Sequence, residues 1–126
     1  MEIAMDVANN IQYWPNGKKE LESWNLNGKS HRLRGPAIIL YYKSGKKRRE
    51  EWRFNGKIHK ISGPAIIWYY EQKNIVEHEY WFINDTQLTG RELIEYRKWL
   101  VDNNLYNKSY DTWTDEEKVL WRLRWI

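Results

Sequence analysis

The stretch EEWRFNGKIHKISGPAIIWYY, residues 50–70, decides the fold, because residues 22–42, ESWNLNGKSHRLRGPAIILYY, carry the same pattern 28 positions earlier. A weaker third copy, EYWFINDTQLTG, follows at residues 79–90, after a step of 29 positions. Self-similarity at a period of roughly 20–50 residues is typical of proteins built from stacked structural repeats. We therefore expect one repeating unit: a partial copy at the start, two fuller copies and a C-terminal segment.

The copies share signature residues that we interpret as structural. They are Trp24, Gly28, His31, Gly35, Pro36, Trp52, Gly56, His59, Gly63, Pro64 and Trp81. Gly17, Gly45 and Asn74 also occupy corresponding positions, at turns earlier in each unit. Asn-Gly pairs are strong turn signals, and a proline fits at the start of a strand, where no ladder amide is needed. The signature therefore marks turns and strand starts.

Each unit is predicted to contain two antiparallel strands. The first, AIILYY at 37–42, is rich in β-branched and aromatic residues, and the second is RREEWRF at 48–54. We expect Ser44-Gly45 to form a two-residue turn between them, with glycine supplying a positive φ. This turn predicts three cross-strand pairs: Tyr41–Arg48, Ile39–Glu50 and Ala37–Trp52. It also predicts one face with Ala37, Ile39, Tyr41, Trp52 and Phe54, and another with Arg49, Glu51 and Arg53.

These copies resemble the MORN-like repeats, in the longer variant found in bacteria and in large DNA viruses of amoebae. The shared positions are the Trp, the Asn-Gly-Lys, the His, the Gly-Pro-Ala and the Tyr-Tyr. The resemblance covers residues 11–90 and implies a chain of β-hairpins that form one elongated, twisted antiparallel sheet. It also implies a scaffolding role with protein or lipid contacts and, for a viral protein, a place in the host cytoplasm. The loop INDTQLTG at 83–90 lacks the Lys, the His and the Pro, so we expect the array to end there.

The C-terminal segment changes to a helical period. Leu93, Tyr96 and Leu100 recur at helical spacing, and Thr114 with Glu117 fits a capping box at the start of a second helix. We therefore predict a mainly β single domain, 1–126. It has MORN-like hairpin repeats at 9–90, which form a single-layer twisted antiparallel sheet, and a helical cap at 91–126 that packs on the end of the sheet.

An aromatic patch is expected near the end of the array. It comprises Trp68, Tyr70, Tyr80 and Phe82, on a face where the second unit carries Glu51 and Arg53. Terminal repeats need a cap, because their apolar surface has no further neighbour. We therefore predict that these four residues form a helix-docking or interaction patch.

No constellation of catalytic residues stands out. His31 and His59 lie a whole repeat step apart without paired acids, and His78 stands alone. Glu50 and Glu51 are adjacent on a strand and so point to opposite faces, while Glu116 and Glu117 suit the first turn of a helix. We predict no enzyme activity and no catalytic, cofactor-binding or metal-binding residue.

Composition and charge leave several partners open. The net charge is only +4, and the one basic run, Lys46–Arg49, should be split between two faces of a strand. There are nine Trp, nine Tyr and no Cys, no secretion signal is visible, and no apolar run is long enough to span a bilayer. We expect a soluble intracellular scaffold that binds a protein partner and can form a homodimer, through either the N-terminal edge of the sheet or its apolar face. Lipid binding through KVLWRLRWI (118–126) and nucleic-acid binding through basic hairpin tips remain as alternatives.

Overall fold

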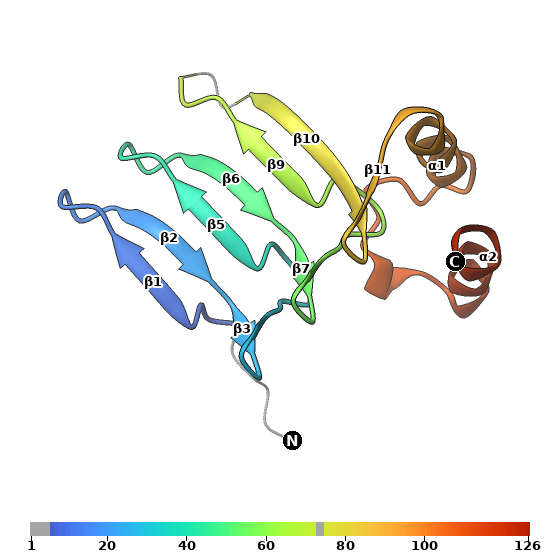
Figure 1. Ribbon diagram of the computed structural model, residues 1–126, viewed down its shortest axis with the longest axis horizontal. Helices are drawn as coiled ribbons and strands as arrows, with labels where there is room; N and C mark the ends of the chain where they lie inside the picture. The colour runs from blue at the N-terminus through green and yellow to red at the C-terminus, as the bar shows by residue number, and fades with distance from the viewer. Residues whose placement is uncertain (1–5, 73–74) are drawn as a thin grey trace.

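The computed structural model describes residues 6–72 and 75–126, so Asn74 lies outside the described residues. Seven antiparallel strands form one open sheet in the order β1-β2-β5-β6-β9-β10-β11 (Figure 1). The strands are β1 (Asn10–Tyr13), β2 (Lys19–Ser23), β5 (Ile38–Tyr41), β6 (Lys47–Glu51), β9 (Ile66–Tyr69), β10 (Val76–Ile83) and β11 (Thr86–Leu88). The predicted mainly β class, with hairpins in an open sheet, is confirmed.

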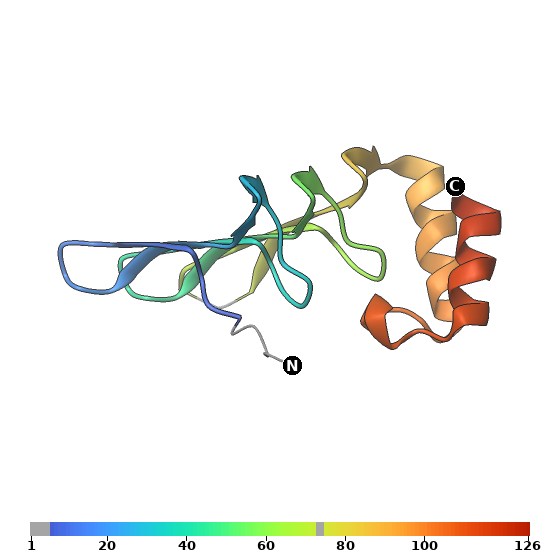
Figure 2. The same cartoon turned by 90° about the horizontal axis from the view of Figure 1, so that it is seen from below.

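Small hairpins follow the second strand of each of the first two units. They pair β3 (Asn25–Leu26) with β4 (Lys29–Ser30) and β7 (Arg53–Phe54) with β8 (Lys57–Ile58). Asn55 and Gly56 at one tip have φ angles of 50° and 81°, as a type I′ turn requires of both central residues. Viewed edge-on, the small hairpins project from one side of the sheet, and the return loops at 31–37 and 59–65 project from the other (Figure 2).

The register of each unit differs from the prediction near the turn. Ile39 pairs with Glu50 as predicted, but Tyr41 pairs with Lys47, across a bulge between Leu40 and Tyr41. The Tyr42 amide donates to the Lys46 carbonyl at 2.9 Å, and Gly45 has a φ of 93°. These contacts define a three-residue loop with glycine in the left-handed region, in place of the predicted two-residue turn.

The predicted pairing of Ala37 with Trp52 is also wrong. The Trp24 amide donates to the Ala37 carbonyl at 2.8 Å, and the Trp52 amide donates to the Ala65 carbonyl at 2.7 Å. The Ala37 amide itself donates to the Glu51 carbonyl at 2.8 Å, so Ala37 bonds to the residue before Trp52. The signature Trp and the Ala of Gly-Pro-Ala therefore join successive units.

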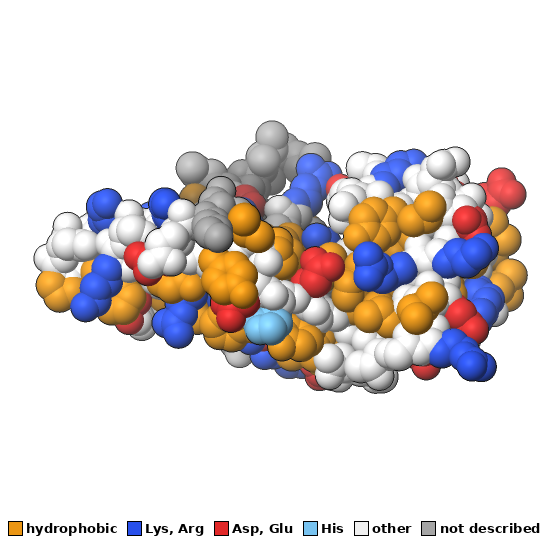
Figure 3. Space-filling model, turned by 90° about the horizontal axis from the view of Figure 1, so that it is seen from above, with side chains coloured by type: hydrophobic (Ala, Val, Ile, Leu, Met, Phe, Trp, Pro, Cys, Tyr) orange, Lys and Arg blue, Asp and Glu red, His pale blue; other side chains and the backbone are white. Residues whose placement is uncertain are grey.

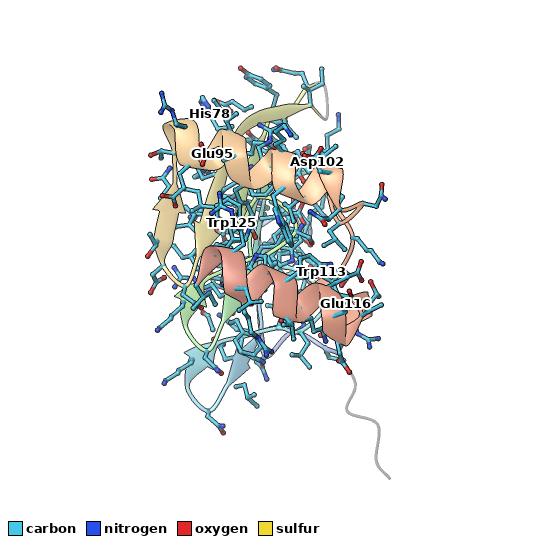
Figure 4. All side chains as sticks on the ribbon, turned by 90° about the vertical axis from the view of Figure 1, so that its right-hand side faces the viewer. His78, Glu95, Asp102, Trp113, Glu116 and Trp125 are labelled. Carbon is cyan, nitrogen blue, oxygen red and sulfur yellow. The ribbon has the colours of Figure 1, made fainter. Side chains whose placement is uncertain are left out.

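Two helices close the end of the array, α1 (Gly90–Asp102) and α2 (Asp115–Trp125), with a short 3-10 turn, η1 (Tyr110–Thr112), before α2. The predicted capping box is confirmed: the Glu117 amide donates to Thr114 Oγ1 at 3.1 Å, and the Thr114 amide donates to Glu117 Oε1 at 2.8 Å. Figure 4 views this end, where Trp125 lies between the two helices. The main hydrophobic core joins them to the repeats through Ile61, Trp81, Leu88, Tyr96, Leu100, Leu105, Trp113 and Trp121.

The docking of the helices differs from the prediction. The core contains Trp81 of β10, with the partly buried Ile83 packed against it, whereas Tyr70 and Tyr80 are 49% and 37% exposed. Successive side chains of a strand point to opposite faces, so helices that pack on Trp81 cannot also cover Tyr80 and Phe82. Trp68, Tyr70, Tyr80 and Phe82 are therefore not the helix-docking surface, and their role in interaction stays a prediction.

Candidate interaction groove

The signature histidines hold the turn of the following unit. The Asn55 amide donates to His31 Nδ1, and the Asn84 amide donates to His59 Nδ1, both at 3.0 Å. Burial lowers the pKa of His59, so its ring is kept neutral, as this acceptor role requires. His78 lies apart on β10 (Figure 4), and its ring nitrogen is 3.6 Å from Glu77. The structure does not bring the three histidines together.

Two glutamates, the buried Glu50 and the half-buried Glu22, are tied to neighbouring strands by tyrosine hydroxyls. The Tyr41 hydroxyl donates to the Glu22 carboxylate, and the Tyr69 hydroxyl donates to the Glu50 carboxylate, one unit further along. Burial and the glutamate raise the pKa of each of these tyrosines. Burial opposes ionisation of Glu22, but hydrogen bonds from Tyr41 and Lys19 outweigh it, and the pKa of Glu22 is lowered. These pairs fasten one unit to the next.

Glu51 is only 2% exposed, although its sequence position suggests a solvated face. Its carboxylate lies 2.7 Å from Arg49 and 2.5 Å from Arg53. A buried carboxylate is tolerated when it is paired in this way. Glu50 and Glu51 thus have different partners on opposite faces, as their adjacency predicted.

A cation stacks on the signature Trp of each full unit. The Arg32 guanidinium lies 3.8 Å from the centre of the Trp24 ring, and Lys60 Nζ lies 3.8 Å from that of Trp52. A Cβ at Gly35 would come within 2.8 Å of the Arg32 guanidinium carbon. The glycine of Gly-Pro-Ala therefore leaves room for the stacked cation, which is a reason for the motif that the turn alone does not supply.

A groove of about 840 Å³ lies between the two return loops and the segment that precedes α2. Its apolar lining includes Trp52, Phe54, Tyr110 and Trp121. The segment is held against the second return loop by the Asn107 amide, which donates to the Ser62 carbonyl at 2.9 Å. The groove is thus a joint product of the repeats and the C-terminal segment, and we call it the interaction groove.

Cations dominate the charge of the interaction groove. Its lining holds Arg32, Arg34, Arg53 and Lys60, but Asp111 is its one acidic residue among those the structure describes. Arg53 is paired with Glu51 at the floor, and Arg34 Nε lies 3.0 Å from Asp111. Burial lowers the pKa of Lys60, which means that its ammonium group is poorly solvated.

Sequence reasoning found only part of this groove. Gly35, Trp52 and His59 belong to the predicted signature and line it, whereas the predicted aromatic patch lies elsewhere. Tyr110 and Asp111 lie in the connection between the two helices. No local signal marks them, since they become part of a groove only when the connection packs back on the repeats.

The basic run is divided as predicted. Lys47 lies 3.5 Å from Glu50 and Arg49 lies 2.7 Å from Glu51, and these two adjacent glutamates point to opposite faces of β6. Arg48 approaches the rings of Tyr42 and Trp68 at 5.8 and 5.9 Å. The run therefore forms no continuous basic stripe.

Over the part of the chain that the structure describes, no three His, Cys, Asp or Glu side chains lie where they could share a metal ion. Within the same residues, neither helix is long and apolar enough to cross a membrane. Hydrophobic side chains are visible over the helical end, interspersed with Lys and Arg (Figure 3). Comparisons with protein-family models, curated proteins and solved structures found no match for this chain.

Proposed function

We propose that the protein is a non-catalytic, MORN-like repeat scaffold that binds a segment of a protein partner in the interaction groove. The observation that carries the proposal is the groove itself, about 840 Å³ in volume and lined by aromatic and cationic side chains. Binding sites for ligands and side chains are typically clefts of roughly 300–1,000 Å³ with a few polar groups among apolar ones. The groove has this size and character.

Fixed aromatic side chains supply the mechanism. Trp52 is held by Lys60 at 3.8 Å, and the Trp121 indole donates to the Tyr96 hydroxyl at 2.9 Å. Tyr110 packs against Trp113 with 5.0 Å between ring centres. Aromatic anchors that are already ordered lose little entropy on binding, and such residues dominate interface energetics. A rigid groove of this kind can hold a partner without any chemical step.

The roles of the titratable groups support a scaffold rather than an enzyme. His31 and His59 each accept a backbone hydrogen bond, and Glu22, Glu50 and Glu51 are occupied by tyrosine or arginine partners. A general acid or base needs a free position near a substrate proton. These groups instead hold the array together.

Site-specific photocrosslinking in the native cell extract tests the proposal. A benzophenone amino acid replaces Leu33, which lines the groove and is 75% exposed, and in a matched control replaces Leu26, which is 53% exposed on β3. We expect a light-dependent protein adduct from position 33 and none from position 26. Equal labelling from both positions, or a nuclease-sensitive or lipid adduct from position 33, contradicts the proposal.

Self-association is a second part of the proposal. Within the described residues β1 pairs only with β2, which leaves its other edge without a strand. An open edge can pair with the same edge of a second copy. Light scattering over a range of concentrations should then show a dimer, and a monomer at high micromolar concentration contradicts this part alone.

A further inference from the structure

We propose that the interaction groove selects an acidic segment of its partner, and that a partner carboxylate binds between Lys60 and Arg34. This inference rests on the proposed function, since it names the chemistry of the segment that the groove would bind. It is argued from a comparison of two equivalent positions in the repeat, Arg32 and Lys60.

Arg32 and Lys60 have the same place in successive units and stack on their Trp at the same distance of 3.8 Å. Arg32 has a carboxylate of its own: its Nε and NH2 atoms donate to Asp6 at 3.0 and 2.9 Å. Lys60 has no ion pair with a carboxylate within residues 6–72 and 75–126. The second unit therefore repeats the cation without a directly paired carboxylate, and among the described residues only the more distant Glu50 acts on its charge.

Residue 34 explains the difference. Arg34 stands 28 positions after Asp6 and so has the equivalent place before the strand of the next unit. The repeat thus puts a second cation where the first unit has the acid. Both Arg34 and Lys60 line the interaction groove, and two like charges there favour an anion between them.

Asp111 is the group that a partner would displace. Its carboxylate pairs with Arg34 at 3.0 Å, but the two side chains are 40% and 79% exposed. Exposed ion pairs contribute little, because solvent screens them, so a partner carboxylate can take over Arg34 at small cost. The poorly solvated ammonium of Lys60, whose pKa is lowered by burial, gains most from such a partner.

The surroundings favour a peptide over a nucleic acid. The cations occupy one groove beside Trp52 and Tyr110, whereas Lys47 and Arg49 of the basic run are already paired with Glu50 and Glu51. Nucleic-acid sites usually extend as a basic stripe along several phosphates. A short acidic segment with an apolar or aromatic residue fits the groove better.

The test uses a capped hexaglutamate peptide as the probe, with hexaglutamine as its uncharged match and a ten-residue oligothymidine as the nucleic-acid arm. Binding is followed through the indole N–H signals of Trp52 and Trp121 in nitrogen-labelled protein. We expect hexaglutamate to shift both signals in a salt-sensitive way and hexaglutamine to shift neither. Equal shifts with hexaglutamine, or tighter binding of the oligothymidine, overturn the inference.

Three variants locate the carboxylate. Lys60→Gln should weaken hexaglutamate binding by roughly fivefold or more, and Lys60→Arg should restore it, because arginine already has this position in the first unit. Asp111→Asn should tighten binding by roughly twofold or more, since it removes the competing carboxylate. Lys57→Gln, on β8 outside the groove, serves as the control and should change nothing. If Lys60→Gln fails to fold, the increase for Asp111→Asn still decides the question.

The two proposals can fail separately. If position 33 crosslinks to a protein but hexaglutamate shifts no indole signal, the partner site stands and the acidic preference is wrong. If hexaglutamate binds and responds to Lys60→Gln but no protein adduct forms, the groove is an anion site without a protein partner. If neither result is obtained, both proposals are wrong.

Discussion

Trp52 and Trp81 have the same position in successive units but opposite surroundings. Trp52 is half-buried beneath Lys60 at the side of the interaction groove, whereas Trp81 is 2% exposed and belongs to the core that joins the helices to the sheet. The cation near Trp81 comes from α1, where the Arg97 guanidinium lies 5.8 Å from the ring centre. The comparison shows that the signature Trp is shielded from water in both places, by a return loop inside the array and by the helices at its end.

The sharpest test of this comparison is to replace Trp81 and Trp52 by alanine, one at a time. Trp81→Ala should lower the free energy of unfolding by about 3–5 kcal/mol, as expected for a large side chain lost from a core. Trp52→Ala should cost about 1–2 kcal/mol, because its ring is only half-buried. Urea denaturation followed by circular dichroism measures both values. Equal losses at the two positions would mean that the helices add no burial beyond what a return loop provides.

The contact between cap and array can be tested at Tyr96. The Tyr96 hydroxyl donates to the Ile61 carbonyl of the second return loop at 2.5 Å and accepts from the Trp121 indole at 2.9 Å. Tyr96→Phe leaves both buried groups without this partner and should cost about 1–3 kcal/mol of unfolding free energy.

Tyr106→Phe is the matched control for that measurement. Tyr106 packs on Trp81 through its ring, with 6.0 Å between ring centres, and should lose less than about 0.5 kcal/mol. The same urea titration serves for both variants. A comparable loss in the control would show that removing any tyrosine hydroxyl near this core has the same effect, and that the two hydrogen bonds of Tyr96 are not specifically responsible.

The two junctions between successive units, Tyr41 with Glu22 and Tyr69 with Glu50, should contribute equally to the free energy of unfolding. Tyr41→Phe and Tyr69→Phe each remove a hydroxyl bound to a glutamate carboxylate, and each should cost about 1–2 kcal/mol. Tyr13, which is 28 positions before Tyr41 and 57% exposed, is the control, and Tyr13→Phe should have almost no effect. Unequal losses for Tyr41 and Tyr69 would show that the units are not energetically equivalent.

The sequence predicted the features that local chemistry controls. Asn55-Gly56 formed the expected turn, Thr114 and Glu117 formed the expected capping box, and the buried face of α1 contains Tyr96 and Leu100 as their spacing predicted. These features depend on a few neighbouring residues, so a single sequence is enough to reveal them.

The features that depend on distant contacts were missed. The bulge between Leu40 and Tyr41 shifted the pairing at the turn, and the Ala37 amide bonds to the Glu51 carbonyl rather than to Trp52. The interaction groove was invisible because Asp111 reaches Arg34 only after the chain folds back. The burial of Glu51 was missed for the same reason, since two arginines must first surround it.

The smallest expected effect is the change in stability with pH that arises from the hydrogen bond between the Asn84 amide and His59. Burial holds the pKa of His59 below its ordinary value of 6.5, and its Nδ1 must stay unprotonated to accept from the Asn84 amide. As the pH falls below about 6.5, the unfolded chain takes up a proton at this residue and the folded chain resists it, so stability should decrease from pH 7 toward pH 5. His59→Gln keeps a hydrogen-bond acceptor without a titrating ring and should flatten that decrease, measured as the melting temperature at each pH. If the variant keeps the full slope of the original protein, the burial of His59 does not control the pH response, and the His–Asn contact is only a geometric feature of the repeat.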